Sequence, residues 1–155
     1  MKENMMRKLI IAAATVATLS ATPAFAETSG EGRIEARGGI AWAGGNEEAI
    51  AGVAAGYDFD LGDKAFIGVE GSADKILAGG TKVVFGATAR LGLKAGENGK
   101  FYVNGGYSFN DSDAFHAGAG YQHKLGKNVY AKVEYRRFFD TVDVNTAAVG
   151  VGLAF

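Results

Sequence analysis

The sequence predicts an all-β fold, an eight-stranded antiparallel up-and-down transmembrane β-barrel, from two observations. The segment Asn145–Phe155 (NTAAVGVGLAF) alternates strictly between an apolar face, which ends on Phe155, and a face of small residues. A period of two indicates a β-strand, because successive side chains leave opposite faces of the pleated backbone. The same alternation recurs in seven earlier segments of roughly ten residues, the length that a tilted strand needs to cross a bilayer. Closing these strands into a barrel removes the apolar edge that an open sheet would expose.

The expected strands follow one another with short turn signals between them. In chain order they are Gly32–Trp42, Ala49–Asp60, Ala65–Asp74, Lys82–Lys94, Lys100–Asn110, Phe115–Leu125, Val129–Phe138 and Asn145–Phe155. In the first strand, Ile34 and Ile40 lie on the face opposite Glu35 and Arg37. In the second, the odd positions from 51 to 59 are apolar, and the even positions are small or acidic. A Gly-Asp turn leads into the third strand, where Glu70 lies on the even face.

The later strands repeat this pattern. The fourth is the clearest, because its odd positions from 83 to 93 are all apolar and its even positions include Lys82, Arg90 and Lys94. In the fifth and sixth strands the odd positions carry most of the aromatic residues. In the seventh, apolar odd positions oppose Lys132 and Glu134. The even number of strands suits a barrel whose two chain ends meet on one side of the membrane.

The first 26 residues are expected to be a cleaved signal peptide, which leaves residues 27–155 as one barrel domain. Basic residues at positions 2, 7 and 8 precede an apolar run over Leu9–Leu19 and an A-x-A cleavage site at Ala24–Ala26. The apolar run is shorter than the ~20 residues of a transmembrane helix. The sequence contains no cysteine, which excludes disulfides, thiol nucleophiles and Cys-based metal sites. The formal net charge of −1 gives no reason to expect a nucleic-acid partner.

The distribution of charge predicts that the apolar face contacts lipid and the charged face lines the lumen. A Lys or Arg on the lipid face near the bilayer midplane costs about 2–4 kcal/mol, whereas a narrow lumen can hold paired charges. The expected lumen charge network consists of Glu35, Arg37, Asp58, Glu70, Lys82, Arg90, Lys94, Lys132, Glu134 and Arg136. The alternative is a soluble β-sandwich or a ligand-carrying barrel, in which the apolar face would point inward.

Large aromatic residues on the apolar face lie near the strand ends. Aromatic belts at both interfaces are typical of membrane barrels. The expected outer girdle contains Trp42, Phe85, Phe109, Phe115 and Tyr135, and the expected periplasmic girdle contains Tyr57, Phe59, Phe101, Tyr121 and Phe155.

Four segments resemble a known family. They are GVEGSAD (Gly68–Asp74), GGYSF (Gly105–Phe109), NVYAKVEYRRF (Asn128–Phe138) and AVGVGLAF at the C-terminus. Together with the N-terminal segment they resemble the opacity-type, OmpA-like outer-membrane β-barrels (porin family) of Gram-negative bacteria, most closely small alphaproteobacterial members. The resemblance covers the whole of residues 27–155. It implies a location in the cell outer membrane and insertion by the outer-membrane assembly machinery, with Val151, Leu153 and Phe155 in the assembly signal.

The expected function is structural, in membrane integrity and surface organisation, without catalysis or a cofactor. A small porin that passes small solutes through a narrow charged lumen is the first alternative, and an opacity-type surface-binding or adhesion protein is the second. Eight strands enclose a space that side chains can just fill, which favours a plugged lumen over an open one. The connections are shorter than the long surface loops of adhesive family members, which disfavours adhesion.

The sequence contains no recognised catalytic motif, neither G-x-S-x-G nor H-E-x-x-H. Ser72 and Ser108 are expected to face inward without an evident His–acid partner. His116 is expected to face the lumen and His123 to lie at a periplasmic strand end, so a shared metal site is not expected.

The outward connections are expected at Ala43–Glu48, Lys75–Thr81, Asp111–Ala114 and Phe139–Asp143. They give the outer rim an acidic character through Glu47, Glu48, Asp111, Asp113, Asp140 and Asp143. Such a rim suits divalent cations among lipopolysaccharide phosphates or a basic partner, although solvated loop tips are the simpler interpretation. Arg137 is a candidate contact for lipopolysaccharide phosphate. The expected partners are outer-membrane lipid, lipopolysaccharide and the assembly machinery; the sequence does not specify an oligomeric state.

Overall fold

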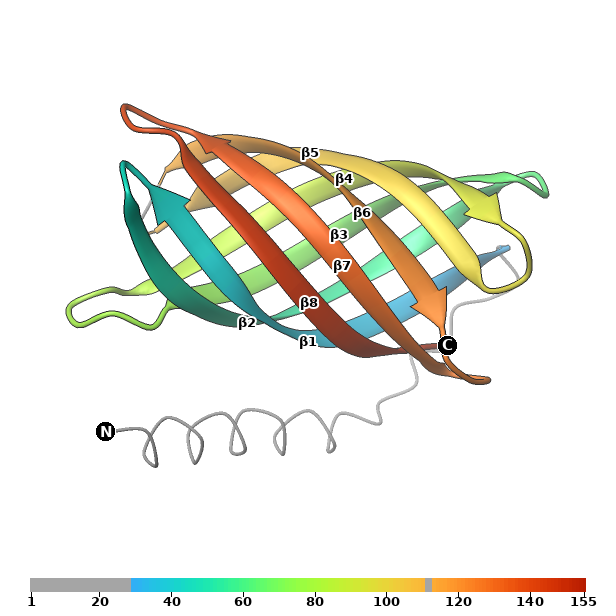
Figure 1. Cartoon of the computed structure of the whole chain (residues 1–155). Helices are drawn as coiled ribbons and strands as arrows, with labels where there is room; N and C mark the ends of the chain where they lie inside the picture. Colours follow the sequence, from blue (N-terminus) through green and yellow to red (C-terminus); the bar gives the residue numbers. More distant parts are fainter. Residues whose placement is uncertain (1–28, 111–112) are drawn as a thin grey trace.

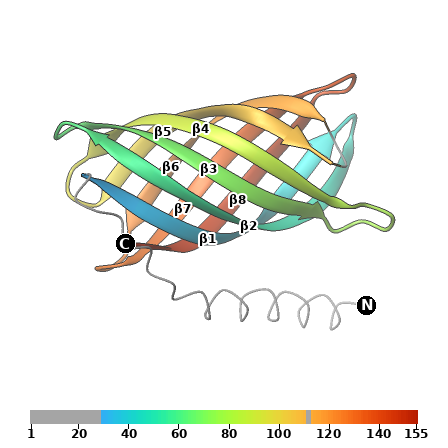
Figure 2. The ribbon, with the colours of Figure 1, turned by 180° about the vertical axis from the view of Figure 1, so that it is seen from behind.

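The fold is a closed barrel of eight antiparallel strands, which confirms the predicted fold class. The computed structural model describes residues 29–110 and 113–155, so the predicted signal peptide lies outside the described residues. The strands are β1 (Gly30–Ala43), β2 (Asn46–Leu61), β3 (Ala65–Ile76), β4 (Val83–Ala95), β5 (Gly99–Phe109), β6 (Ala114–Lys124), β7 (Val129–Phe139) and β8 (Val144–Ala154). Each strand pairs with the next, and β8 pairs with β1 to close the sheet. Figures 1 and 2 show the closed wall from opposite sides.

The two ends of the barrel differ. One end, here called the loop end, carries the β1–β2, β3–β4 and β7–β8 connections. The opposite end, the terminal end, carries the start of β1, the C-terminal residue and the turns after β2, β4 and β6 (Figure 1). Backbone hydrogen bonds between Gly32 and Phe155, at 2.7 and 2.9 Å, extend the closing β1–β8 pairing to the last residue.

The strand boundaries differ from the prediction chiefly at the loop end. The expected loop Ala43–Glu48 is wrong: β1 and β2 are joined by the two-residue turn Gly44-Gly45, and Glu47 and Glu48 belong to β2. Both turn glycines have positive φ, 55° and 85°, a conformation that glycine adopts without a steric cost and that suits a tight hairpin. Similarly, β3 continues to Ile76, so the β3–β4 connection begins two residues later than expected.

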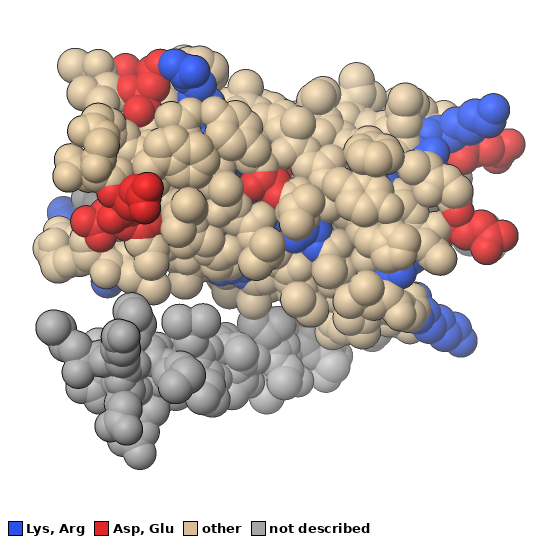
Figure 3. Space-filling model, viewed as in Figure 1, with Lys and Arg blue, Asp and Glu red and all other residues tan. Residues whose placement is uncertain are grey.

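The wall is apolar outside and polar inside, as the alternation predicts. Outward residues such as Leu93 (62 % exposed) and Val149 (63 % exposed) contrast with Arg33, Asp58 and Gln122, which are fully buried inside. Figure 3 shows one face of the exterior, where most charged side chains lie toward the two ends and fewer are visible in the middle. Residues 29–110 and 113–155 contain no helix that is long and apolar enough to cross a membrane.

Candidate functional site

The barrel interior contains a layered cluster of ion pairs, and this cluster is the candidate functional site. Strand β1 supplies Arg33, Glu35 and Arg37 at alternate positions, so all three side chains point inward and are buried. The other strands around the wall, except β8, contribute further polar or charged inward side chains to the same space. We refer to these buried, mutually contacting charges as the interior cluster.

Glu70 of β3 lies at the centre of the interior cluster. Its carboxylate accepts hydrogen bonds from Arg33 at 2.7 Å, from Arg136 at 2.7 Å and from Arg37 at 3.2 Å. Lys132 Nζ lies 3.7 Å from the same carboxylate. A single buried anion therefore joins cations from β1 and β7, the two strands that flank β8.

Asp58 of β2 is the corresponding anion nearer the terminal end. It accepts hydrogen bonds from Arg90 Nε at 2.8 Å and from Lys100 Nζ at 3.1 Å, and Arg33 Nε lies 3.4 Å away. The Arg90 guanidinium also stacks on the Tyr102 ring, 4.5 Å from its centroid. Glu31 continues the cluster to the terminal end, where it pairs with Lys100 and Lys124.

Two tyrosines link further carboxylates into the interior cluster. Tyr130 donates a hydrogen bond of 2.7 Å to Glu35, and Tyr102 donates one of 2.7 Å to Glu134. Glu35 is also paired with Lys132 at 2.5 Å. Each of these buried charges thus has an oppositely charged neighbour, which is the condition under which buried charge is tolerated.

Inward glycines make room for these large side chains. A Cβ atom added to Gly152 of β8 would lie 2.5 Å from the Tyr130 ring, and one added to Gly120 of β6 would lie 2.5 Å from the Tyr102 ring. From Thr146 to Ala154 the inner face of β8 holds only small residues and so accepts the side chains that cross from β7. The glycine content of the chain therefore has a packing role within the barrel.

The structure places most of the predicted lumen residues in the interior cluster. Those that are buried there are Glu35, Arg37, Asp58, Glu70, Arg90, Lys132, Glu134 and Arg136. Lys94 instead lies at the terminal end, partly exposed and 2.8 Å from Asp60. The prediction for Lys82 is wrong: Lys82 is exposed and precedes β4, because the alternating pattern runs past the end of the strand.

The prediction omitted several members of the interior cluster, including Arg33, Lys100 and Asp74. Arg33 and Lys100 are buried in it, and Asp74 is paired with Arg37 through two hydrogen bonds. Each of the three lies at a position that the alternation assigns to the inner face, so the period of two would have identified all of them. What the period does not reveal is which inward residues meet across the lumen.

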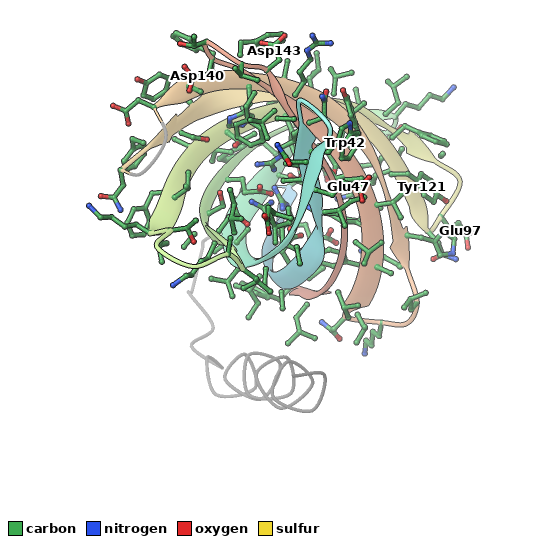
Figure 4. The ribbon with its side chains drawn as sticks, turned by 60° about the vertical axis from the view of Figure 1, so that its left-hand side comes forward. Trp42, Glu47, Glu97, Tyr121, Asp140 and Asp143 are labelled. Carbon is green, nitrogen blue, oxygen red and sulfur yellow. The ribbon has the colours of Figure 1, made fainter. Side chains whose placement is uncertain are left out.

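The predicted aromatic residues form two groups on the outer wall. Toward the loop end, Trp42 contacts Tyr135 with ring centroids 6.2 Å apart. Other pairs at that end are Phe85–Phe109 and Tyr107–Phe115, and those at the terminal end are Tyr57–Phe59 and Phe101–Tyr121. In Figure 4, Trp42 lies toward the near loop end and Tyr121 toward the far end. At the C-terminus, Val151, Leu153 and Phe155 all face outward.

Separate cavities open at the two ends of the interior cluster. The cavity at the loop end has a volume of about 120 Å³ and reaches inward to Arg37, Glu134 and Arg136. The cavity at the terminal end has a volume of about 210 Å³ and reaches Lys100 and Gln122. No described residue lines both cavities, and the charges of the interior cluster lie between them.

The inward histidine is held by hydroxyl groups. His116 Nε2 lies 3.0 Å from Thr88 Oγ1, and Nδ1 lies 3.4 Å from Ser108 Oγ. His123 lies on the outer wall, where its Nδ1 is 2.9 Å from the Tyr121 hydroxyl. Within residues 29–110 and 113–155, no three His, Asp or Glu side chains are grouped so that they could hold a metal ion.

This combination of a closed eight-stranded wall, an apolar exterior and a charged interior defines the class of transmembrane β-barrels. Among solved structures, the chain is similar to the N-terminal β-barrel domain of Pseudomonas aeruginosa OprF, at 20 % identity over 81 % of this chain and 99 % of that chain, with a TM-score of 0.61. Ail of Yersinia pestis, in complex with the heparin analogue sucrose octasulfate, matches at 16 % identity over 81 % and 99 %, with a TM-score of 0.57. Neisserial surface protein A matches at 14 % over 81 % and 97 %, with a TM-score of 0.55.

These similarities confirm, at the level of the fold, the predicted resemblance to OmpA-like outer-membrane barrels. No protein-family model and no curated protein matches the sequence. The opacity-type assignment and the alphaproteobacterial source stay predictions.

Proposed function

We propose that this chain is a non-catalytic outer-membrane barrel with a structural role in membrane integrity. One observation carries the proposal: the apolar wall surrounds an interior in which ion pairs fill the space between the two end cavities. Such a wall suits lipid, because every strand edge is paired and the exposed band between the charged ends is apolar. The interior cluster stabilises the barrel from within and leaves no continuous path for solutes.

The alternative is a small porin. The cavities at the two ends support it, since they approach the interior cluster from opposite sides. Conduction would require several ion pairs to separate, among them the Glu70 pairs at 2.7 Å. The structural role needs no such rearrangement, and for this reason we favour it.

The acidic rim bears on the surface-binding alternative. Glu47, Asp140 and Asp143 lie at the loop end, which we propose faces the outside of the cell (Figure 4). A heparin analogue, the ligand in the Ail complex, is strongly anionic, and an acidic rim would repel it. A surface-binding role for this chain would therefore require a basic or neutral partner.

The proposed partners are outer-membrane lipid, lipopolysaccharide and the assembly machinery. Arg137 supports the lipopolysaccharide contact, because it faces outward at the loop end beside the Trp42–Tyr135 pair and is half exposed, bound to Asp143 at 2.6 Å. The outward Val151, Leu153 and Phe155 support recognition of β8 by the assembly machinery.

The gel mobility of the membrane fraction in SDS, boiled against unboiled, tests the outer-membrane assignment. A closed barrel resists SDS until it is heated, because no strand edge offers a start for unfolding. We expect a heat-dependent shift of a band found in the outer-membrane fraction. A soluble periplasmic band without a shift would contradict the assignment and would favour an inward-facing ligand barrel.

A further inference from the structure

The inner wall changes character at the loop end of the barrel. Elsewhere the inward positions are mainly charged, polar or glycine, but around this mouth they form an apolar collar. The collar consists of Ala41, Ile50, Ile76, Val84, Phe138 and Val144, which come from six different strands and line the 120 Å³ cavity. An apolar lining is not needed to hold the ion pairs below it.

A notch of hydroxyl groups lies beneath the collar. Ser72 of β3, Gly86 of β4 and Ser108 of β5 are direct neighbours across the ladder, and all three line the cavity. A Cβ atom added to Gly86 would lie 2.7 Å from Ser72 Oγ and 3.9 Å from Ser108 Oγ. Gly86 therefore has no side chain to cover the two serine hydroxyls, and a Cβ atom at this position would crowd Ser72 Oγ.

The polar groups of the cavity differ in what they can offer a ligand. Arg37 is paired with Asp74, and Arg136 is paired with Glu134 and Glu70, so the charged groups are balanced. Ser72 is only 9 % exposed, yet none of residues 29–110 and 113–155 forms a hydrogen bond with its hydroxyl. The polar group that remains available to a ligand is therefore the uncharged hydroxyl of Ser72, which lines the cavity beneath the apolar collar.

We propose that this cavity binds a small uncharged amphiphile, a single-ring molecule with one hydroxyl group. The hydroxyl sits over Gly86 and bonds to Ser72, while the ring contacts Ile76, Val84 and Phe138. At about 120 Å³ the cavity is slightly smaller than an apolar cavity of roughly 150 Å³ that encloses benzene in another protein, and because it opens at the loop end it need not enclose the whole ring. Ligand sites of this kind combine an apolar lining with a few placed polar groups. Lys75 and Asp140, which also line the cavity, place its opening at the loop end.

Isoleucine methyl NMR of the full chain in phosphatidylcholine nanodiscs tests the proposal, with phenol as the probe. Ile50 and Ile76 report on the collar, whereas Ile34, Ile40 and Ile67 lie on the outer wall and report on phenol dissolved in lipid. We expect saturable shifts of the two collar methyls and only a linear drift of the outer three. Toluene, which lacks the hydroxyl, and benzoate, which is charged, should both bind more weakly than phenol.

Three variants locate the site. Gly86→Ala adds a Cβ atom that crowds Ser72 Oγ and should abolish the saturable shifts, while Gly71→Ala, on the outer wall with nothing within 4 Å, should leave them unchanged. Ser72→Ala, a change that should not disturb folding, should weaken phenol binding by roughly 2- to 10-fold, the effect of one lost hydrogen bond. Equal, linear shifts of all five methyls would show partition into lipid only and overturn the proposal. Saturable shifts that survive both Gly86→Ala and Ser72→Ala, or tighter binding of benzoate, would also overturn it.

Discussion

At the scale of the residue, Glu70 shows why the interior tolerates so much charge. Its carboxylate is buried, but three guanidinium groups and one ammonium group surround it within 3.7 Å. Taking a charge out of water is costly, and only several close partners of opposite sign offset that cost. Conversely, removing the shared anion leaves its cations buried without that compensation.

We therefore expect Glu70→Gln to destabilise the barrel. Neutralising one member of a buried ion network costs about 3–5 kcal/mol, because the remaining charges stay buried. The measurement is the free energy of unfolding, obtained from urea unfolding of the protein in lipid vesicles. The matched control, Glu48→Gln, removes an exposed carboxylate at the loop end and should change stability by less than about 0.5 kcal/mol. Equal effects of the two variants would mean that the interior cluster does not stabilise the fold.

At the scale of the element, β8 closes the barrel with an inner face of small residues. Gly150 and Gly152 leave space for side chains that extend from β7, above all Tyr130, which reaches Glu35 on β1. The Tyr130–Glu35 hydrogen bond thus crosses the inner face of β8 and links its two neighbours, β7 and β1. Its outer face, by contrast, carries the large apolar residues that contact lipid.

Gly152→Ala should loosen this closure. The added Cβ would overlap the Tyr130 ring and the backbone carbonyl oxygen of Ile34, and the carbonyl cannot move without distorting β1. Overpacking of this kind costs about 1–3 kcal/mol, again measurable as the free energy of unfolding in vesicles. Gly71→Ala introduces the same methyl group into open space and serves as the control. If both substitutions are neutral, the inward glycines have no packing role.

The sequence could predict the strands and the direction of their side chains, because the period of two is a local property. Arg33, Tyr102 and Tyr130, which were not among the predicted lumen charges, also lie at positions that the alternation assigns to the inner face. Which inward residues touch depends on the tilt and stagger of the closed wall, which no local pattern records. Tyr130 meets Glu35 across 95 residues of chain and Arg136 meets Glu70 across 66, so the Glu70-centred arrangement was not predictable. Strand ends were also uncertain, as Lys82 and the Gly44-Gly45 turn show.

At the scale of the whole molecule, the polarity of the barrel is inverted relative to a soluble protein. Leu93, Phe115 and Val149 are more than 60 % exposed, while the fully buried residues include Arg33 and Asp58. In water this wall would be an aggregation hazard, but in a bilayer it is the favoured surface. The charge at the two ends fits the level of the headgroups (Figure 3).

An arginine scan of the outer wall tests the bilayer orientation. Val149 lies in the middle of β8, so Val149→Arg should cost about 2–4 kcal/mol in vesicles. Val129→Arg, at the terminal end of β7, should cost only about 0–1 kcal/mol, because the side chain reaches the interface. The difference in unfolding free energy between the two variants is the measurement. Absence of any dependence on depth would contradict a membrane-spanning wall.

The most direct measurement is the conductance of the reconstituted protein in a planar bilayer, with insertion verified by the heat-dependent gel shift. Because the interior cluster separates the two end cavities, we expect no stable unitary currents from the unmodified chain. Arg90→Ala removes a cation from the cluster, and Lys82→Ala removes an exposed cation outside it as the control. A silent bilayer with inserted protein is the predicted result. Stable unitary currents that change with Arg90→Ala but not with Lys82→Ala would contradict the plugged interior and establish a pore.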